Sequence, residues 1–345
     1  MAPQTAVMAT VKRTLRVGVP IEFAFRMLTE KMGTWWPASH HIGQVPFAEV
    51  IVEPRAGGRW LESGEHGEEC QWGTVLVWDP PKQVVFSWQL QSDWKFSPDM
   101  ARASEVAFTF FAEGPEATRM EFEHRHLERH GEGWENIRKG VAGGWAGILV
   151  EFERTLVDPG VAPKLTQTER DFALMDLDAS LEKFLGCVKN FTTEQWKFKV
   201  VADRWSVAET AEHVATVEDR AYRRITEKSL QEPADPEKRK TLPHRDMKVV
   251  ELGNSREPNL RAPELVQPSA RWGVPDELLQ NIQAFRSRTK DFVRTTQADV
   301  RTHYLEHPFF GTLDVYQWML LISAHMRRHT AQIEEVKKHP NFPRG

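Results

Sequence analysis

Two histidines four positions apart, His325 and His329, have the residue type and spacing that favour metal chemistry. They lie in the run Trp318–Val336, which contains no glycine or proline and is therefore expected to form a helix. Both imidazoles fall on the apolar stripe that should face a core, while Arg327 and Arg328 are expected to point elsewhere. Burying two imidazoles without partners costs on the order of a few kcal/mol, and a divalent metal is the commonest shared partner. The pair therefore predicts either half of a metal site or an unusual piece of core packing.

Two further histidine pairs have the same spacing in a less suitable context. His126 and His130 span a strand end and a glycine-flanked turn. His303 and His307 run directly into Pro308, and the residue before a proline is disfavoured in a helix. Neither pair is therefore expected to present two imidazoles on one buried helix face.

A third histidine, His213, follows a strong helix start. Ser206 and Glu209 have the capping-box spacing, in which the serine hydroxyl and the glutamate each satisfy a free backbone amide. The helix that begins there should run to about Ser229, with His213 turned roughly inward. His213 is thus the best candidate for a third ligand, and three histidines would leave metal positions for water or substrate.

The elements that would position these histidines are four helices in the second half of the chain. We expect them at residues 166–190, 206–229, 275–296 and from about 313 to 337. The segment 231–274 is rich in proline and charge, lacks periodicity, and is either functional cover or partly disordered. Four helices with one long crossover loop predict a four-helix bundle, a fold that places metal sites on inward-facing positions.

The first half of the chain favours an antiparallel sheet. Seven strands separated by turn residues are expected at 12–19, 47–53, 59–63, 70–78, 83–89, 105–112 and 119–126. A short helix at 22–28 and a long one from about 133 to 157 complete this half. The long helix contains three glycines within residues 140–144, which indicates a kink or a close approach to a sheet or ligand. This order predicts an α+β domain, residues 11–157, in which a curved sheet grips one helix.

Length and composition agree with two soluble domains. The 345 residues suggest two domains joined by the proline-rich linker 158–165, and 13 tryptophans suggest a sizeable core or an apolar ligand cavity. The formal charge of −4 comes without a basic block, so nucleic acid is not expected as a partner. Cys70 and Cys187 fall in different halves, which fits a reducing compartment. With no signal peptide and no long apolar stretch, a cytoplasmic protein without membrane contact is expected.

Several motifs of the first half resemble the AHSA-type branch of the START-like (SRPBCC) superfamily. They are TLRVGVPIEFAFRMLTE, WWP, VEPRAGGRWLE, CQWGTVLVWDPPKQVVFSWQ and LERHGEGW. The resemblance implies a helix-grip fold around an apolar cavity that holds a small hydrophobic molecule or a partner protein, and it assigns no catalytic residue. Candidate cavity residues are Trp72, Trp88, Phe110, Phe122, His124 and Trp145. Plain core packing is the favoured interpretation of each of these residues, and Arg59 and Glu62 are expected to be solvated.

Residues 166–337 resemble the DinB/YfiT-like superfamily of metal-binding four-helix bundles. The resemblance rests on WSVAE followed by His213, and on HMRRH followed by Gln332. It implies that His213, His325 and His329 bind Zn or Ni. Glu209, Glu212 and Gln332 are interpreted as solvated helix residues, with a role behind the ligands or as a base as the alternative.

Two functions remain open from the sequence. The first is a metal-dependent hydrolase or thiol S-transferase of small molecules, with a thiol cosubstrate, in a chain that could form a homodimer. The second is a non-catalytic ligand- or client-binding stress-response protein with a structural metal. An open metal position facing a cleft would favour the enzyme, and a fourth protein ligand would favour the structural role.

Overall fold

The computed structural model describes residues 9–156, 164–242, 246–256, 261–272 and 275–344. The chain divides into two units, residues 1–158 and 159–345. The expected linker falls largely on residues 157–163, which lie outside the described part. None of the described helices combines the length and apolar character that a bilayer span requires.

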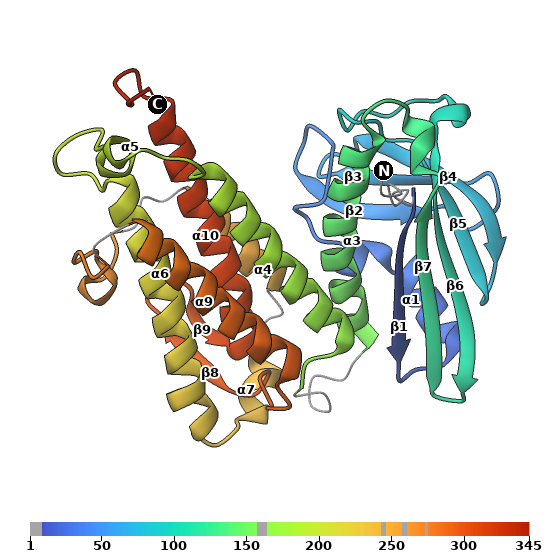
Figure 1. Cartoon of the computed structure of the whole chain (residues 1–345). Coiled ribbons are helices and arrows are strands. Elements are labelled where there is room, and N and C mark those ends of the chain that lie inside the picture. The colour runs from blue at the N-terminus through green and yellow to red at the C-terminus, as the bar shows by residue number, and fades with distance from the viewer. Residues whose placement is uncertain (1–8, 157–163, 243–245, 257–260, 273–274, 345) are drawn as a thin grey trace, which may run out of the picture. The chain divides into compact units, whose positions relative to one another are not determined.

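Seven antiparallel strands form one curled sheet in the first unit, in the order β1-β7-β6-β5-β4-β3-β2 (Figure 1). They are β1 (Val11–Val17), β2 (Phe47–Val52), β3 (Arg59–Gly64), β4 (Glu69–Asp79), β5 (Gln83–Trp88), β6 (Ser104–Gly114) and β7 (Ala117–Arg125). Along β7, Met120, Phe122 and His124 are buried while the residues between them are more exposed, as strand alternation requires. The expected strands and the α+β fold are therefore confirmed, with small differences at the strand ends.

Three helices cover this sheet: α1 (Ile21–Thr29), α2 (Met32–Trp35) and α3 (Trp134–Leu156). The strands curl around α3, whose Trp145 packs against Phe122 and Phe108 with ring centroids 4.8 and 5.8 Å apart (Figure 1). The glycines of α3 do not interrupt it, because the helix is continuous over its 23 residues. Two of these glycines, Gly140 and Gly144, line the cavity described below.

Four long helices pack in the cyclic order α4-α10-α6-α9 in the second unit (Figure 1). They are α4 (Gln167–Cys187), α6 (Val207–Arg223), α9 (Pro275–Thr295) and α10 (Val315–Lys337). The capping box of Ser206 and Glu209 is present, and a second one joins Asp314 to Gln317 at the start of α10. After Arg223 the chain continues as a π-helical turn to Lys228 and a 3-10 turn to Gln231, so the helical stretch ends close to the predicted residue.

The crossover between α6 and α9 is largely structured where it is described. It contains α7 (Pro236–Thr241), α8 (Asp246–Asn254) and a 3-10 turn at Glu264–Val266, and α8 packs against α10. The sequence also left unpredicted the short helix α5 (Thr193–Lys197) and the hairpin of β8 (Tyr304–His307) and β9 (Gly311–Asp314) that precedes α10. These elements are too short to produce a clear hydrophobic period.

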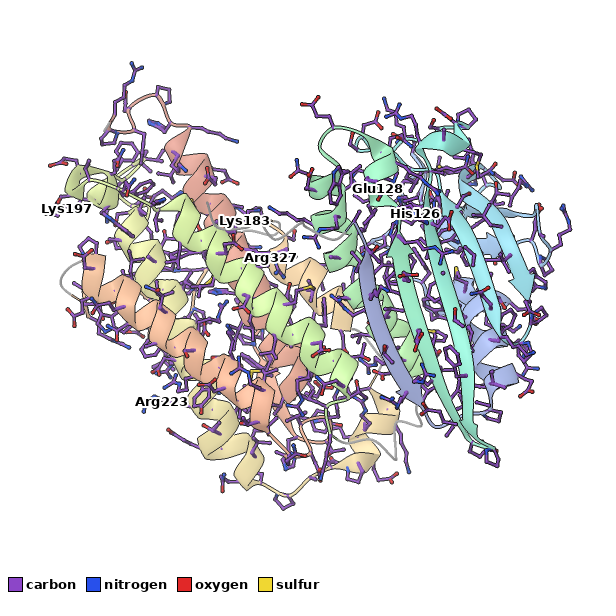
Figure 2. The ribbon with its side chains drawn as sticks, turned by 45° about the vertical axis from the view of Figure 1, so that its right-hand side comes forward. His126, Glu128, Lys183, Lys197, Arg223 and Arg327 are labelled. Atoms are coloured by element: carbon purple, nitrogen blue, oxygen red, sulfur yellow. The ribbon has the colours of Figure 1, made fainter. Side chains whose placement is uncertain are left out.

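Buried ion pairs fix the helices of the bundle relative to one another. Arg286 on α9 is fully buried and bonds Glu218 on α6, with a shortest distance of 2.9 Å. Arg301 is fully buried among Glu169, Asp246 and Asp314. A further link, Arg327 of α10 with Asp176 of α4, lies between those two helices (Figure 2). Because an unpaired buried charge is costly, these pairs specify which helix faces meet.

Candidate metal centre

Three imidazoles meet in the core of the bundle. The Nε2 atom of His325 lies 3.1 Å from Nε2 of His213 and 3.1 Å from Nε2 of His329. His213 comes from α6, and the other two lie one turn apart on α10. Among the described residues, the cluster consists of these three side chains and has no fourth histidine, cysteine or carboxylate. The structure thus brings together all three residues that the sequence proposed as ligands.

The tautomers of two of these rings are fixed by hydrogen bonds on the far side. The Nδ1–H of His213 donates to the backbone carbonyl of Val266 at 2.7 Å. The Nδ1–H of His329 donates to Oε1 of Gln332 at 2.9 Å. A neutral imidazole that donates from Nδ1 has a free lone pair at Nε2. Both rings therefore direct a lone pair at Nε2 of His325.

The surroundings keep all three rings neutral. Burial lowers the pKa of His213, and burial with the neighbouring His213 lowers that of His329 to about 3. Burial, followed by the charges of His329 and His213, lowers the pKa of His325 well below its usual value. Neutral imidazole is the form that binds metal ions.

A divalent cation fits this donor set. With metal–nitrogen bonds of about 2.0–2.1 Å, two imidazole nitrogens on one ion lie about 2.9–3.4 Å apart, and the observed separations fall in this range. Without an ion, His325 can supply only one Nε2 proton to two facing lone pairs. This unsatisfied arrangement is the observation that favours a cation over ordinary core packing.

The histidine cluster forms part of the wall of a cavity of about 950 Å³. Aromatic and apolar side chains line it together with the three histidines and several arginines. Trp205, next to the cap of α6, stacks near His213 with ring centroids 4.9 Å apart. His307 also lines the cavity, although its place before Pro308 had excluded it from the predicted site. Its ring stacks on Phe310 at 4.6 Å, and burial lowers its pKa to about 4.

The polar residues near the predicted ligands have roles that the sequence did not resolve. Gln332 orients His329, so its interpretation as a solvated residue is wrong. Glu212 is buried and accepts backbone N–H bonds from Ser269, Ala270 and Arg271 at 2.8–3.1 Å. It is therefore neither solvated nor a base, and it holds the crossover segment against α6.

Glu209 and Arg328 differ in whether they line the cavity. Glu209 caps α6 and pairs with Lys199 at 2.8 Å, and it does not line the cavity. Arg328 lines the cavity, so the expectation that it points elsewhere is wrong, whereas Arg327 does point away, toward Asp176. The role of the Val266 carbonyl had no sequence signal, because any residue supplies a backbone carbonyl.

The first unit contains a separate cavity of about 810 Å³, lined by three of the six predicted residues: Trp72, Trp88 and Trp145. Gly140 and Gly144 of α3 also line it. The indole N–H groups of Trp72 and Trp88 are buried and have no hydrogen-bond acceptor among the described residues. These two N–H groups are enclosed by protein atoms, and the tryptophan-lined cavity is suited to an apolar molecule.

The other three predicted cavity residues do not line this cavity but lie in the packed core. Phe110 packs on Phe25, and Phe122 packs on Phe108 and Trp145. The fully buried His124 accepts a bond from the Trp145 indole at 3.1 Å. On its other side Nε2 lies 2.8 Å from the Ser104 hydroxyl, which is also 2.8 Å from Nε2 of the buried His130. Alternation along β6 and β7 predicts that these residues point inward, but it does not distinguish a core position from a cavity position.

The burial of Glu62 differs from the sequence expectation. It was expected to be solvated, but it is buried on the cavity wall and accepts backbone N–H bonds from Ile42 and Gly43. Arg59 is exposed, as expected, and pairs with Glu53 at 2.8 Å. His126, in the first of the excluded pairs, is a surface residue 3.6 Å from Glu128 (Figure 2).

The fold and the site define a protein in which a helix-grip domain is followed by a helical bundle with a three-histidine centre. Residues 18–157 match the family model of Activator of Hsp90 ATPase homolog 1-like protein, and residues 176–333 match that of the DinB superfamily. The chain therefore contains an AHSA1-like domain followed by a DinB-like domain.

Three similar proteins each match less than half of the chain. The uncharacterized protein YuaE of Bacillus subtilis is 22% identical over 151 residues, which are 44% of this chain and 88% of that protein. The anthrahydroquino-gamma-pyrone synthase Txn09 is 35% identical over 43% of this chain and 96% of its own, with a TM-score of 0.34. The self-sacrificing resistance protein CalC from Micromonospora echinospora is 31% identical over 43% of this chain and 93% of its own, with a TM-score of 0.35.

Proposed function

We propose that the DinB domain holds one divalent cation, Zn or Ni, on His213, His325 and His329 and acts on small molecules as a hydrolase or thiol S-transferase. The observation that carries this proposal is the convergence of three neutral Nε2 donors at the wall of an open cavity of about 950 Å³. Members of the DinB superfamily typically bind metal, which supports the same assignment.

The chemistry follows from what the chain places around the three histidines. When bound, a divalent cation supplies a Lewis acid that lowers the pKa of a coordinated water or thiol. Val266 and Gln332 orient two of the imidazoles and increase their basicity through the Nδ1–H bonds. Three neutral ligands leave the charge of the cation intact, and the cavity has room for a small substrate and a thiol cosubstrate.

A non-catalytic protein with a structural metal is the second candidate. Structural zinc sites are closed by four protein ligands, whereas catalytic sites keep a position open. The three-histidine cluster has no fourth protein ligand among the described residues and borders a cavity, which favours the catalytic reading.

For the AHSA1-like domain we propose a small apolar molecule as the ligand. Its support is the cavity of about 810 Å³ lined by Trp72, Trp88 and Trp145. Two free cysteines fit a reducing compartment, and we propose that the protein acts in the cytoplasm.

Elemental analysis of protein purified without a metal-affinity tag tests the metal assignment. Wild type is compared with His213→Ala and His325→Ala, and with His66→Ala, an exposed histidine of the other domain, as the control. We expect about one ion per chain in wild type and the control and far less in the two cluster variants. Added metal should also stabilise wild type, by about 2.7 kcal/mol at a hundredfold excess over Kd.

The proposal fails at the metal step if wild type binds no ion and gains no thermal stability from added Zn, Ni, Mn or Fe. If wild type does bind metal, its activity is screened with thiol cosubstrates and with ester and amide substrates. A metal-loaded protein that is inactive in every screen would support the structural-metal alternative.

A further inference from the structure

The cavity beside the three histidines is strongly basic. Six arginines line it: Arg204, Arg220, Arg224, Arg256, Arg261 and Arg328. The only acidic residue among its lining residues is Asp203, which is exposed. This imbalance contrasts with the whole chain, whose formal charge is −4.

Two of these arginines lie on the same face of the helical stretch as His213. Arg220 and Arg224 follow His213 by seven and eleven positions, so at about 1.5 Å per residue their backbones lie about 10 and 16 Å farther along the helix. Val217 lies between them and His213 on the same wall. The helix thus presents the metal ligand at one point of the cavity and two guanidinium groups at another.

These two guanidinium groups have no carboxylate partner among the described residues. The half-buried side chain of Arg220 forms no hydrogen bond or ion pair there. Arg224 donates only to the backbone carbonyl of Glu306, at 3.3 Å, and lies over the Trp318 ring at 5.4 Å. By contrast, the fully buried Arg286 and Arg301 each have carboxylate partners. Arg220 is half-buried and Arg224 is exposed, so both guanidinium groups are free to form charge-assisted hydrogen bonds with an external anion.

The same end of the cavity is aromatic. Trp318, Phe309 and Phe310 line it beside Arg224, and His307 stacks between Phe310 and Trp318. Aromatic rings beside a guanidinium suit a molecule with an apolar body and a charged end. The cavity therefore offers an anion site and an apolar surface at a distance from the metal ligands.

We propose that the substrate of this centre is a small organic anion. Its carboxylate or phosphate binds Arg220 and Arg224, its apolar part lies on Trp318 and Phe310, and its reacting end reaches His213, His325 and His329. This inference rests on the proposed function and specifies its substrate class. It also gives Arg220 and Arg224 the role of specificity-determining residues.

Isothermal titration calorimetry with three probes tests the inference on the full, metal-loaded chain. The probes are 4-phenylbutyrate, 2-phenylethyl phosphate and the neutral 4-phenylbutyramide. The variants are Arg220→Gln, Arg224→Gln and the charge-retaining Arg220→Lys. The matched control is Arg223→Gln, because Arg223 lies on the same helix but is exposed, pairs with Asp219 at 3.1 Å and does not line the cavity (Figure 2).

At least one anion should bind about tenfold more tightly than the amide, since hydrogen bonds to charged groups contribute about that much. Arg220→Gln and Arg224→Gln should each weaken that binding about tenfold, Arg220→Lys less, and Arg223→Gln not at all. The tighter of the two anions identifies the acidic group as carboxylate or phosphate. Unchanged circular dichroism confirms that each variant is folded.

The inference is overturned if the amide binds as tightly as both anions, or if the anions bind the two glutamine variants as they bind wild type. Probe molecules in the AHSA1-like cavity would produce the second result. Metal content is measured on the same samples, so the two proposals can fail separately. A metal-loaded protein without anion preference contradicts only this inference, and arginine-dependent anion binding without metal contradicts only the proposed metal centre.

Discussion

The Nε2 atoms of His213 and His325 lie 3.1 Å apart, although 112 positions separate the two residues in the chain. That distance depends on how α6 packs against α10 and on the bond that holds the His213 ring to Val266 in the crossover. The metal centre is therefore a property of the assembled bundle and its covering segment. Residues that hold a ring or the cover in place should affect the centre without contacting a metal themselves.

Gln332→Ala removes the acceptor that orients His329. We expect metal affinity to fall by about 10–100-fold, because partners behind a ligand fix its tautomer and direction. The overall stability of the metal-free protein should change little. Competition with a chromophoric chelator measures the affinity.

The control for this change is Gln283→Ala, since Gln283 is an exposed residue of α9 whose side chain, within the described part of the chain, bonds the Leu279 carbonyl alone. Equal affinities for the Gln332 and Gln283 variants would show that the hydrogen bond to His329 does not support the ligand.

Glu212→Ala should loosen the crossover segment without unfolding the bundle. It leaves the N–H groups of Ser269, Ala270 and Arg271 without their acceptor, and Ala270 has the unfavourable φ of +57° that these bonds help to hold. We expect hydrogen exchange of residues 264–272 to accelerate at least about tenfold, since one lost charged hydrogen bond contributes about 1.5–3 kcal/mol. Metal affinity should fall as well, because Val266 belongs to the same segment.

Glu227→Ala serves as the control, because Glu227 is 66% exposed and lies 3.9 Å from its partner Arg223. Exchange that is unchanged in the Glu212 variant would mean that other contacts hold the segment.

The ligands themselves could be predicted from the sequence because each lies in a helix with a clear signal. The capping box locates the start of α6, and the unbroken apolar period of α10 places His325 and His329 on one face. The residues that tune the site could not be predicted in this way. Val266 acts through its backbone, and Glu212 acts on a segment without periodicity. His307 is the last residue of β8, and its packing against Trp318 depends on tertiary structure.

The fold of the first domain was predictable for a similar reason. Its turns are rich in glycine and proline, so strand limits follow from the sequence. Which inward residues form the cavity was not predictable, since Phe122 and Trp72 both alternate inward and are equally buried, yet of the two only Trp72 lines the cavity. Buried Glu62 also escaped detection, because its partners are the backbone amides of a loop about 20 residues earlier.

Gly144→Leu should reduce ligand binding by the AHSA1-like domain. Gly144 lines the cavity, and a Cβ there would lie 3.7 Å from the His40 ring, so a leucine must extend into the cavity. We expect the affinity for the neutral fluorescent probe N-phenyl-1-naphthylamine to fall about tenfold, which corresponds to about 1.4 kcal/mol. The neutral probe avoids the basic cavity of the other domain.

The matched change is Gly143→Ala on the same helix, where a Cβ would meet no atom within 4 Å. It should leave probe binding unchanged and raise stability by up to about 1 kcal/mol through helix propensity. Probe binding that is equally weak in both variants would indicate a general effect on α3, and unchanged binding in both would place the probe elsewhere.

His124 should make the stability of the AHSA1-like domain sensitive to acid. Burial lowers its pKa from 6.5 to about 3 in the folded domain, so between these values the unfolded chain binds a proton that the folded chain does not. The free energy of unfolding therefore falls as the pH drops through this window. At about pH 5 the contribution of His124 is a loss of about 2 kcal/mol relative to neutral pH.

The substitution His124→Gln removes the titrating group and leaves an acceptor for the Trp145 indole N–H. The variant should be less stable than wild type near pH 7, because its core packing is altered, and the difference should shrink as the pH falls toward 5. Calorimetry, with the transition of this domain followed at several pH values, measures the two slopes. His66→Gln, at an exposed position of the same domain, should keep the wild-type slope. Parallel curves for wild type and His124→Gln would show instead that another group, such as the buried His130, causes the acid sensitivity.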